Sequence, residues 1–160
     1  MRRSDREVRN ISIIKGILDD CNTCHLAMVD NGSPYVIPLS YAYVINNEGL
    51  TLYFHSAKEG RKNSILHANN AVCFEMCNEG ELVIDAKTPC NSGYTYSSVH
   101  GFGSAFFIHD VHEKCSALSL LMAHQSNIEV DFTAEQADSV CVFKVISTDF
   151  TGKMKRRSSE

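Results

Sequence analysis

The sequence has no tryptophan, only three prolines, and no apolar run near the ~20 residues that a membrane-spanning helix needs. It also lacks an excess of basic residues: the formal net charge is −4, whereas nucleic-acid-binding proteins carry a basic face that neutralises phosphates. The G-x-G-x-x-G fingerprint of nicotinamide dinucleotide binding is absent as well. We therefore expect neither a membrane partner nor a nucleic-acid partner.

What is present is the composition of a globular protein, with 44% hydrophobic and 21% charged residues. The length suits one domain with a sizeable core, which we place at residues 1–150, followed by a short basic, disordered tail at 151–160. Residues 1–7 are basic and then mixed in charge, and no apolar stretch behind them indicates an export signal. Seven scattered cysteines, an odd number, suit a reducing compartment. These features predict a cytoplasmic protein.

Short apolar or alternating runs bounded by turn residues predict strands, and two turns at 30–33 and 46–49 predict hairpins. Helices are few and stand singly between strands, which favours a mainly β fold, an antiparallel β-barrel with attached helices. The predicted strands cover 25–29, 34–44, 51–55, 71–76, 94–108 and 140–149. The predicted helices cover 4–19, capped by Ser4-x-x-Glu7, then a stretch from Ser56-x-x-Glu59 through Leu66, and one from Asp110-x-x-Glu113 through Met122.

The predicted strand 34–44 alternates small residues at even positions with large residues at odd positions. One of its faces therefore leaves room for a ligand, although the tapered interior of a barrel without a ligand would give the same alternation. Pro38 cannot donate a hydrogen bond to a neighbouring strand, so we expect an edge, a bulge or an open groove at this point.

The segment from Tyr53 to Lys62 carries the strongest indication of a binding site. A strand ends here, Ser56 can cap a helix, and the free N–H groups of the first helical turn then face outward from the strand end. Such a helix start binds phosphate through those N–H groups and the helix dipole, while Arg61 and Lys62 add positive charge. The pattern predicts a mononucleotide phosphate site. Basic residues in a first helical turn are also common on ordinary solvated surfaces.

Three blocks of the sequence, in their order and spacing, resemble those of the 5-nitroimidazole-resistance (Nim) proteins: Pro34–Tyr41, Leu52–Lys62 and Ser97–Gly103. The Nim proteins belong to the pyridoxamine 5′-phosphate oxidase-like superfamily of FMN-binding split barrels, and the likeness extends from Asp5 to Lys153. It implies an FMN-binding split barrel of the antiparallel Greek-key type. It also implies a homodimer with two FMN sites, each built from both subunits.

Carried over residue by residue, the resemblance gives a set of cofactor-binding residues. The FMN phosphate would be held by His55, Ser56, Arg61 and Lys62. The flavin ring would lie along the backbone of Pro38, Leu39 and Ser40, and Ser98 would contact the cofactor from a later strand. Vitamin B6 oxidases also use basic residues on the long strand and a C-terminal arginine cluster, which this chain lacks, so vitamin B6 oxidation is not expected.

The resemblance also makes His55 the candidate catalytic residue, because the histidine of this block faces the flavin in Nim proteins. An imidazole titrates near neutral pH and could exchange a proton beside flavin N5. The alternative is a histidine that only hydrogen-bonds the phosphate or the opposite strand.

Two other motifs allow competing interpretations. Cys21-x-x-Cys24-His25 matches the string for covalent haem attachment, and it could also be half of a zinc site or a redox dithiol, but helix-end and core cysteines are the simpler interpretation. Met122 and His124 could form a cofactor lid or supply a haem ligand, although the helical spacing of Met122 with Leu118 and Leu121 favours a place in the core.

Two functions remain open at this stage. The first is an FMN-dependent oxidoreductase that takes electrons from NAD(P)H or a redox partner and reduces a small organic acceptor, with the flavin supplying the chemistry. The second is a non-catalytic module that holds flavin or haem for storage, sensing or electron transfer. The fold alone does not distinguish them.

Overall fold

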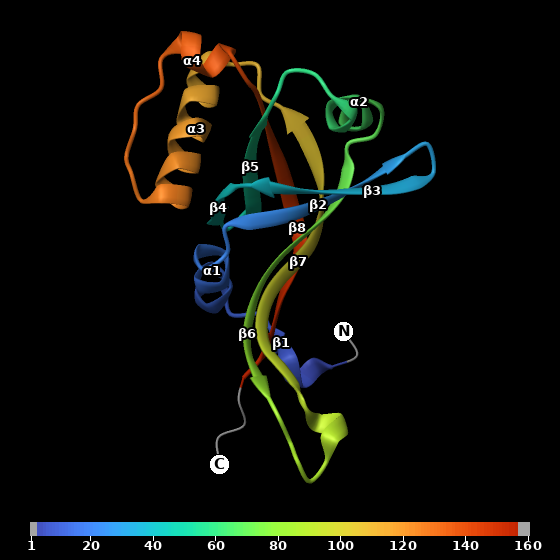
Figure 1. Ribbon diagram of the computed structural model, residues 1–160. Coiled ribbons are helices and arrows are strands. Elements are labelled where there is room, and N and C mark those ends of the chain that lie inside the picture. The colour runs from blue at the N-terminus through green and yellow to red at the C-terminus, as the bar shows by residue number, and fades with distance from the viewer. Residues whose placement is uncertain (1–2, 157–160) are drawn as a thin grey trace.

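The fold contains eight strands and four α-helices within residues 3–156, the part of the chain that the computed structural model describes (Figure 1). The strands are β1 (Glu7–Val8), β2 (Thr23–Asp30), β3 (Ser33–Ser40), β4 (Ala42–Asn46), β5 (Gly49–Ser56), β6 (Ala71–Val83), β7 (Gly93–Phe107) and β8 (Cys141–Lys155). The helices are α1 (Ile11–Asp19), α2 (Arg61–Ala68), α3 (Val111–Ser126) and α4 (Ala134–Asp138).

One antiparallel sheet runs in the order β3-β2-β6-β7-β8-β5-β4, with β1 paired to β8. The strands β3 and β4 lie at opposite edges of this order, yet Tyr41 alone separates them in the chain. The sheet must therefore curl until its two edges approach, which makes a barrel with an open seam. Tyr41 is fully buried at this corner, and its hydroxyl donates to the Leu18 carbonyl oxygen at 2.7 Å. The expected split barrel, mainly β and antiparallel, is confirmed.

The hairpin and edge predictions are also confirmed. Asn31 and Gly32 both have positive φ angles, 50° and 85°, as a two-residue turn between β2 and β3 requires. Asn46 pairs with Gly49 across the turn between β4 and β5. Pro38 lies on β3, an edge strand, where its missing N–H costs no sheet hydrogen bond.

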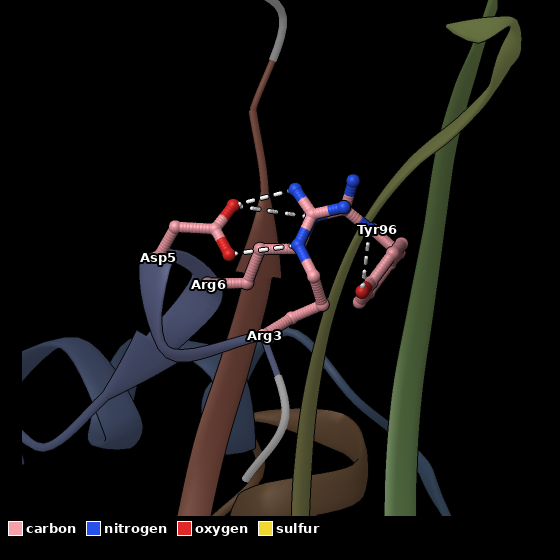
Figure 2. A network of polar contacts seen from close by, with 4 residues as sticks. All are labelled: Arg3, Asp5, Arg6 and Tyr96. Atoms are coloured by element: carbon pink, nitrogen blue, oxygen red, sulfur yellow. Dashed lines mark hydrogen bonds and ion pairs between the residues drawn. The ribbon is translucent and has the colours of Figure 1, made fainter.

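Beyond the barrel, β6, β7 and β8 continue as a long arm (Figure 1). The register between β7 and β8 shifts after Phe102, where the arm meets the barrel. Gly101 lies at this junction, and a Cβ there would come within 2.8 Å of the Asp149 carbonyl oxygen. The N-terminal segment lies along the arm, where Arg3 forms a paired contact with Asp5 and Arg6 donates to the Tyr96 hydroxyl at 3.5 Å (Figure 2).

Two apolar clusters form the core. The larger fills the barrel and buries the inner face of α1 through Ile14, Ile17 and Leu18. The smaller lies beneath α3 and α4, where Leu118 and Leu121 meet Val142 of β8. This second cluster fixes the start of β8 against the helices, next to the end of β5.

The predicted start and the predicted cap of the first helix are both wrong. The helix expected over 4–19 begins only at Ile11, because Asn10 caps it by accepting hydrogen bonds from the N–H groups of Ser12 and Ile13. The Ser4-x-x-Glu7 capping box does not form. Glu7 and Val8 instead pair with the end of β8.

Three further boundaries differ from the predictions. The single strand expected over 34–44 is broken at Tyr41, where the chain passes from one sheet edge to the other. The tail expected from residue 151 instead continues β8 to Lys155, since β7 and β1 both pair with it; Arg157 and the rest of the tail lie outside the described residues. The helix expected near Ser56 begins at Arg61, after Gly60, whose φ of 140° favours glycine.

Candidate functional site

The ammonium group of Lys62 lies in an unusual place for a lysine. The side chain is 9% exposed, and Nζ lies 4.6 Å from the centre of the Phe143 ring. Nζ donates to Ser56 Oγ at 2.7 Å and to Asn63 Oδ1, both neutral oxygens. Within residues 3–156 no carboxylate pairs with it, and burial lowers its pKa. A buried cation without a counterion costs folding free energy, which an anionic ligand would offset.

Arg61 points elsewhere, since consecutive residues on a helix project about 100° apart. Its Nε donates to Asp30 Oδ2 at 2.8 Å, and its guanidinium lies 4.5 Å from the centre of the Tyr35 ring. The side chain lines a cleft of about 500 Å³ between α2 and the β2–β3 turn. The structure therefore does not bring Arg61 and Lys62 to one point: Arg61 is held by the turn, and Lys62 is directed to the end of β5.

The start of α2 has the features of an anion-binding helix terminus. No side chain of the described part of the protein caps this helix, so the N–H groups of its first residues are not taken up by a capping group. The Asn63 N–H bonds to the Gly60 carbonyl at 3.0 Å. The Asn63 side chain donates to the carbonyls of Ala57 and Lys58, which fixes the loop between β5 and α2.

His55 and Ser56 end β5 beside this helix start. His55 is exposed, because it follows the fully buried Phe54 and neighbours in a strand alternate in direction. Its imidazole is therefore open to a ligand. Ser56 is half-buried; its Oγ accepts the Lys62 hydrogen bond and donates to the Ala57 carbonyl. Ser56 thus contributes as a partner of Lys62 and not as the helix cap.

The proposed ring-binding residues lie on the edge strand β3. Pro38, Leu39 and Ser40 pair on one side with β2, and the other side of β3 has no partner strand among the described residues. Pro38 and Ser40 are exposed, while Leu39 packs against the barrel core. The free backbone edge leaves N–H and C=O groups available to a planar, hydrogen-bonding ligand.

Ser98 is not close to the other expected site residues within one chain. His55 pairs with Val142 at the start of β8, whereas Ser98 pairs with Lys153 near its end. At about 3.3 Å per residue this separation is roughly 35 Å along the strand. Ser98 lies on the arm, and Lys62 lies at the opposite end of β8.

Pro38 and Ser98 nevertheless share a face of the sheet. Sheet pairing places Pro38, His25, Glu75 and His100 in one row, because residues paired across strands point the same way. Ser98 precedes His100 by two residues on β7 and so points to this side as well. The next row holds Val36, Ala27, Cys73 and Phe102, and its two outer members are 60% and 53% exposed.

The remaining motifs show no second site. Cys21 and Cys24 are both buried, and burial raises the pKa of the Cys21 thiol to about 11, which is unsuited to a reactive dithiol. Cys24 and His25 project to opposite faces of β2, so they cannot hold one haem together. His124 packs beside Tyr41, with ring centres 4.9 Å apart, and Met122 is half-buried.

Two residues of the site were missed by the sequence reasoning. Asn63 links the Lys62 ammonium to the loop after β5, and Asp30 holds Arg61. An asparagine directly after two basic residues at a helix start carried a weak signal, whereas the link between Asp30 and Arg61 depends on the tertiary fold.

Within residues 3–156, no group of three or more His, Cys, Asp or Glu side chains is arranged to hold a metal ion. Over the same range, no helix is both long enough and apolar enough to cross a membrane.

Comparison with known proteins places these features in a family. The family described as Pyridoxamine 5′-phosphate oxidase matches residues 13–154. No curated protein matches the chain. Among solved structures, a proposed 5-nitroimidazole antibiotic resistance protein from Bacteroides thetaiotaomicron is 30% identical, with a TM-score of 0.79 over 92% of this chain and 86% of that one.

Two further similar structures share the fold at lower identity. A flavocytochrome from Azotobacter vinelandii is 20% identical, with a TM-score of 0.80 over 98% of this chain and 72% of that one. An FAD and haem binding protein from Mycobacterium smegmatis is 15% identical, with a TM-score of 0.80 over 97% of this chain and 76% of that one. Together, the family match over residues 13–154 and the split barrel show that this chain belongs to the pyridoxamine 5′-phosphate oxidase-like family.

Proposed function

We propose that this protein binds FMN and works as a flavin-dependent reductase of a small organic acceptor, with NAD(P)H or a redox protein as the electron donor. The observation that carries the proposal is the buried Lys62 ammonium, which has only neutral oxygen partners at the end of β5. A phosphate at this position would supply the missing negative charge, and the uncapped start of α2 would add backbone N–H groups.

The ring of the cofactor would extend from the phosphate toward β3. The free edge of Pro38, Leu39 and Ser40 offers backbone groups to the polar rim of a flavin. Bound FMN supplies the redox chemistry. The role proposed for this chain is to hold the phosphate at Lys62 and Ser56 and to present the exposed His55 imidazole, which can hold or release a proton near the cofactor.

The proposed assembly is a homodimer that completes each site. Val36 and Phe102 expose apolar surface in one row of the sheet face that also carries Pro38 and Ser98. A two-fold partner packed on this face would bury that row and bring a second Ser98 toward β3. In this arrangement Ser98 of one subunit contacts the cofactor held by Lys62 of the other, although the two residues lie far apart within one chain.

The visible spectrum of the purified protein tests the proposed function. A flavin absorbance that is bleached by NADH or NADPH, and restored by a nitroaromatic or quinone acceptor, supports a reductase. Flavin that is bound but never reduced by these donors indicates a binding module. Failure to bind added FMN in a calorimetric titration contradicts the proposal.

Haem is the second candidate ligand, because two similar folds are described as a flavocytochrome and as an FAD and haem binding protein. A Soret band would support haem in place of flavin or beside it. Since the Cys21 and Cys24 thiols are both buried in the core, where they cannot form thioether bonds to a porphyrin, we expect any haem to be released by acid-acetone extraction.

A further inference from the structure

A separate cleft of about 280 Å³ opens beside the Lys62 site. It lies between the loop before α2, the start of β8 and the helices α3 and α4, and its lining includes Lys58, Asn63, His67, Phe107, Lys114 and Asp138. This volume is just below the range of about 300–1,000 Å³ that holds a whole small ligand. The cleft therefore suits one part of a larger molecule.

The cleft has an excess of positive charge, because two lysine side chains share one carboxylate. Lys58 Nζ and Lys114 Nζ both approach one carboxylate, that of Asp138, at 3.7 and 3.5 Å. These distances exceed the roughly 2.7–2.9 Å of a strong charge-assisted hydrogen bond. The Lys114 side chain is only 13% exposed, whereas Asp138 is 74% exposed. Of the residues that line the cleft, Asp138 is the only carboxylate.

The cleft adjoins the Lys62 site through Asn63 and through Cys141. Asn63 lines the cleft and also accepts the Lys62 hydrogen bond on its side-chain oxygen. The same side chain donates to the Lys58 carbonyl at 2.9 Å. Cys141, which also lines the cleft, is the strand partner of Ser56. Lys58 and Lys62 are thus linked through one side chain, that of Asn63.

One wall of the cleft is aromatic. His67 stacks on Phe107 with ring centres 4.1 Å apart and planes 19° from parallel. Stacked rings beside paired ammonium groups suit a phosphate that carries a heteroaromatic base, since bases stack on aromatic side chains while lysines hold the phosphate.

We propose that this cleft is a second phosphate-binding subsite, in which Lys58 and Lys114 take the phosphate of a nucleotide moiety next to the flavin phosphate. The inference rests on the proposed function, which places the flavin phosphate at Lys62, but the subsite itself is formed by different side chains. The phosphate could belong to the adenylate half of FAD or to a separate nucleotide bound beside FMN. Asp138 is the competing internal anion that such a phosphate displaces.

The test measures calorimetric affinities for FMN, FAD and, on the FMN-loaded protein, adenosine 5′-diphosphate. Lys58→Gln and Lys114→Gln each remove one charge, and we expect each to weaken FAD or adenosine diphosphate binding roughly tenfold with little change for FMN. Asp138→Asn removes the competing anion and should strengthen the binding of FAD or adenosine diphosphate. Lys87→Gln, an exposed lysine outside the cleft, is the matched charge control.

Tighter binding of FAD than of FMN that is lost in the two lysine variants supports the subsite and identifies FAD as the source of the phosphate. Adenosine diphosphate that binds the FMN-loaded protein and is lost in the same variants supports a separate nucleotide. Equal affinities for FAD and FMN with no adenosine diphosphate binding, or losses matched by Lys87→Gln, overturn the proposal. If no flavin binds at all, the proposed function fails, and adenosine diphosphate binding to the flavin-free protein then decides the subsite independently.

Discussion

The Lys62 ammonium lies 2.7 Å from Ser56 Oγ, which joins the first turn of α2 to the last residue of β5. A hydroxyl can orient an ammonium group but cannot neutralise its charge. The contact therefore keeps a cation in a largely buried position at the strand end, ready for an anion, at the expense of the stability of the ligand-free protein.

Replacement of Lys62 separates its two effects. We expect Lys62→Met to leave the free energy of unfolding of the flavin-free protein equal or higher, because it removes an uncompensated buried charge while retaining the volume of the side chain. FMN affinity should fall by at least tenfold, since a charged hydrogen bond contributes about 1.5–3 kcal/mol. Riboflavin, which lacks the phosphate, should bind both proteins equally. Unchanged FMN binding in calorimetry would show that the phosphate site lies elsewhere.

The lowered pKa of Lys62 predicts a pH dependence with a defined sign. Burial places its folded-state pKa below the ordinary value of 10.5, so between these two values the unfolded chain binds more protons than the native protein. The stability of the flavin-free protein due to this group should therefore rise with pH across that window. FMN affinity should fall over the same window as the ammonium deprotonates. Titration of Lys62→Met should show neither trend.

Neighbouring atoms pack so closely around Gly101 that a side chain at this position should destabilise the protein. A Cβ at this position would lie 2.8 Å from the Asp149 carbonyl oxygen and 2.5 Å from Phe74 Cζ. We expect Gly101→Ala to lower the free energy of unfolding by about 1–3 kcal/mol, as overpacking does. Gly32→Ala is not a matched control because of its positive φ, whereas Gly16→Ala on α1 meets no atom within 4 Å and should be neutral or stabilising in the same denaturant titration.

The sequence predicted the parts of the fold that depend on local chemistry. The Asn31-Gly32 turn, the Asp110 helix cap and the edge position of Pro38 each follow from a residue type with one strong conformational preference, and all three are confirmed. The start of α1 could not be chosen locally, because Ser4 and Asn10 are both good caps. The pairing of Glu7 and Val8 with the distant β8 decides between them.

The candidate site shows the same division. The sequence predicted that Ser56 and Lys62 lie together at a strand end, and the structure shows them in direct contact. It could not predict that Arg61 is held by Asp30, because that contact depends on the folding of the β2–β3 turn over α2. Nor could spacing reveal that Ser98 of β7 pairs with the end of β8 that lies far from Lys62, because this distance is known only once the strand pairing is known.

Substitution of the two cysteines of the Cys21-x-x-Cys24 motif should have little effect on cofactor binding. Cys21 and Cys24 are 4% and 0% exposed, so they act as small core side chains. We expect the double Cys→Ala variant to retain its chromophore and its oligomeric state, with a modest loss of thermal stability from the lost volume. Slower flavin reoxidation at full chromophore content would instead indicate a redox pair. Loss of one porphyrin mass from the intact protein would identify covalent haem.

Sharing of each site between two subunits can be tested by mixing defective variants. Lys62→Met removes the proposed phosphate anchor, and Ser98→Arg places a bulky cation at the residue that the partner would contribute. If each site takes Lys62 from one subunit and Ser98 from the other, a mixed dimer contains one intact site and one doubly defective site. Each variant alone should then bind little FMN.

Co-refolding the two variants in equal amounts should restore FMN binding to roughly a quarter of all sites, because about half of randomly paired dimers are mixed and each has one intact site. Phe102→Asp, which places a charge on the apolar row of the proposed interface, should give a monomer in sedimentation and abolish this recovery. If both residues acted within one chain, each chain of every mixed dimer would still carry one defect. Co-refolding would then restore no FMN binding. This outcome would contradict a site that is shared between two subunits.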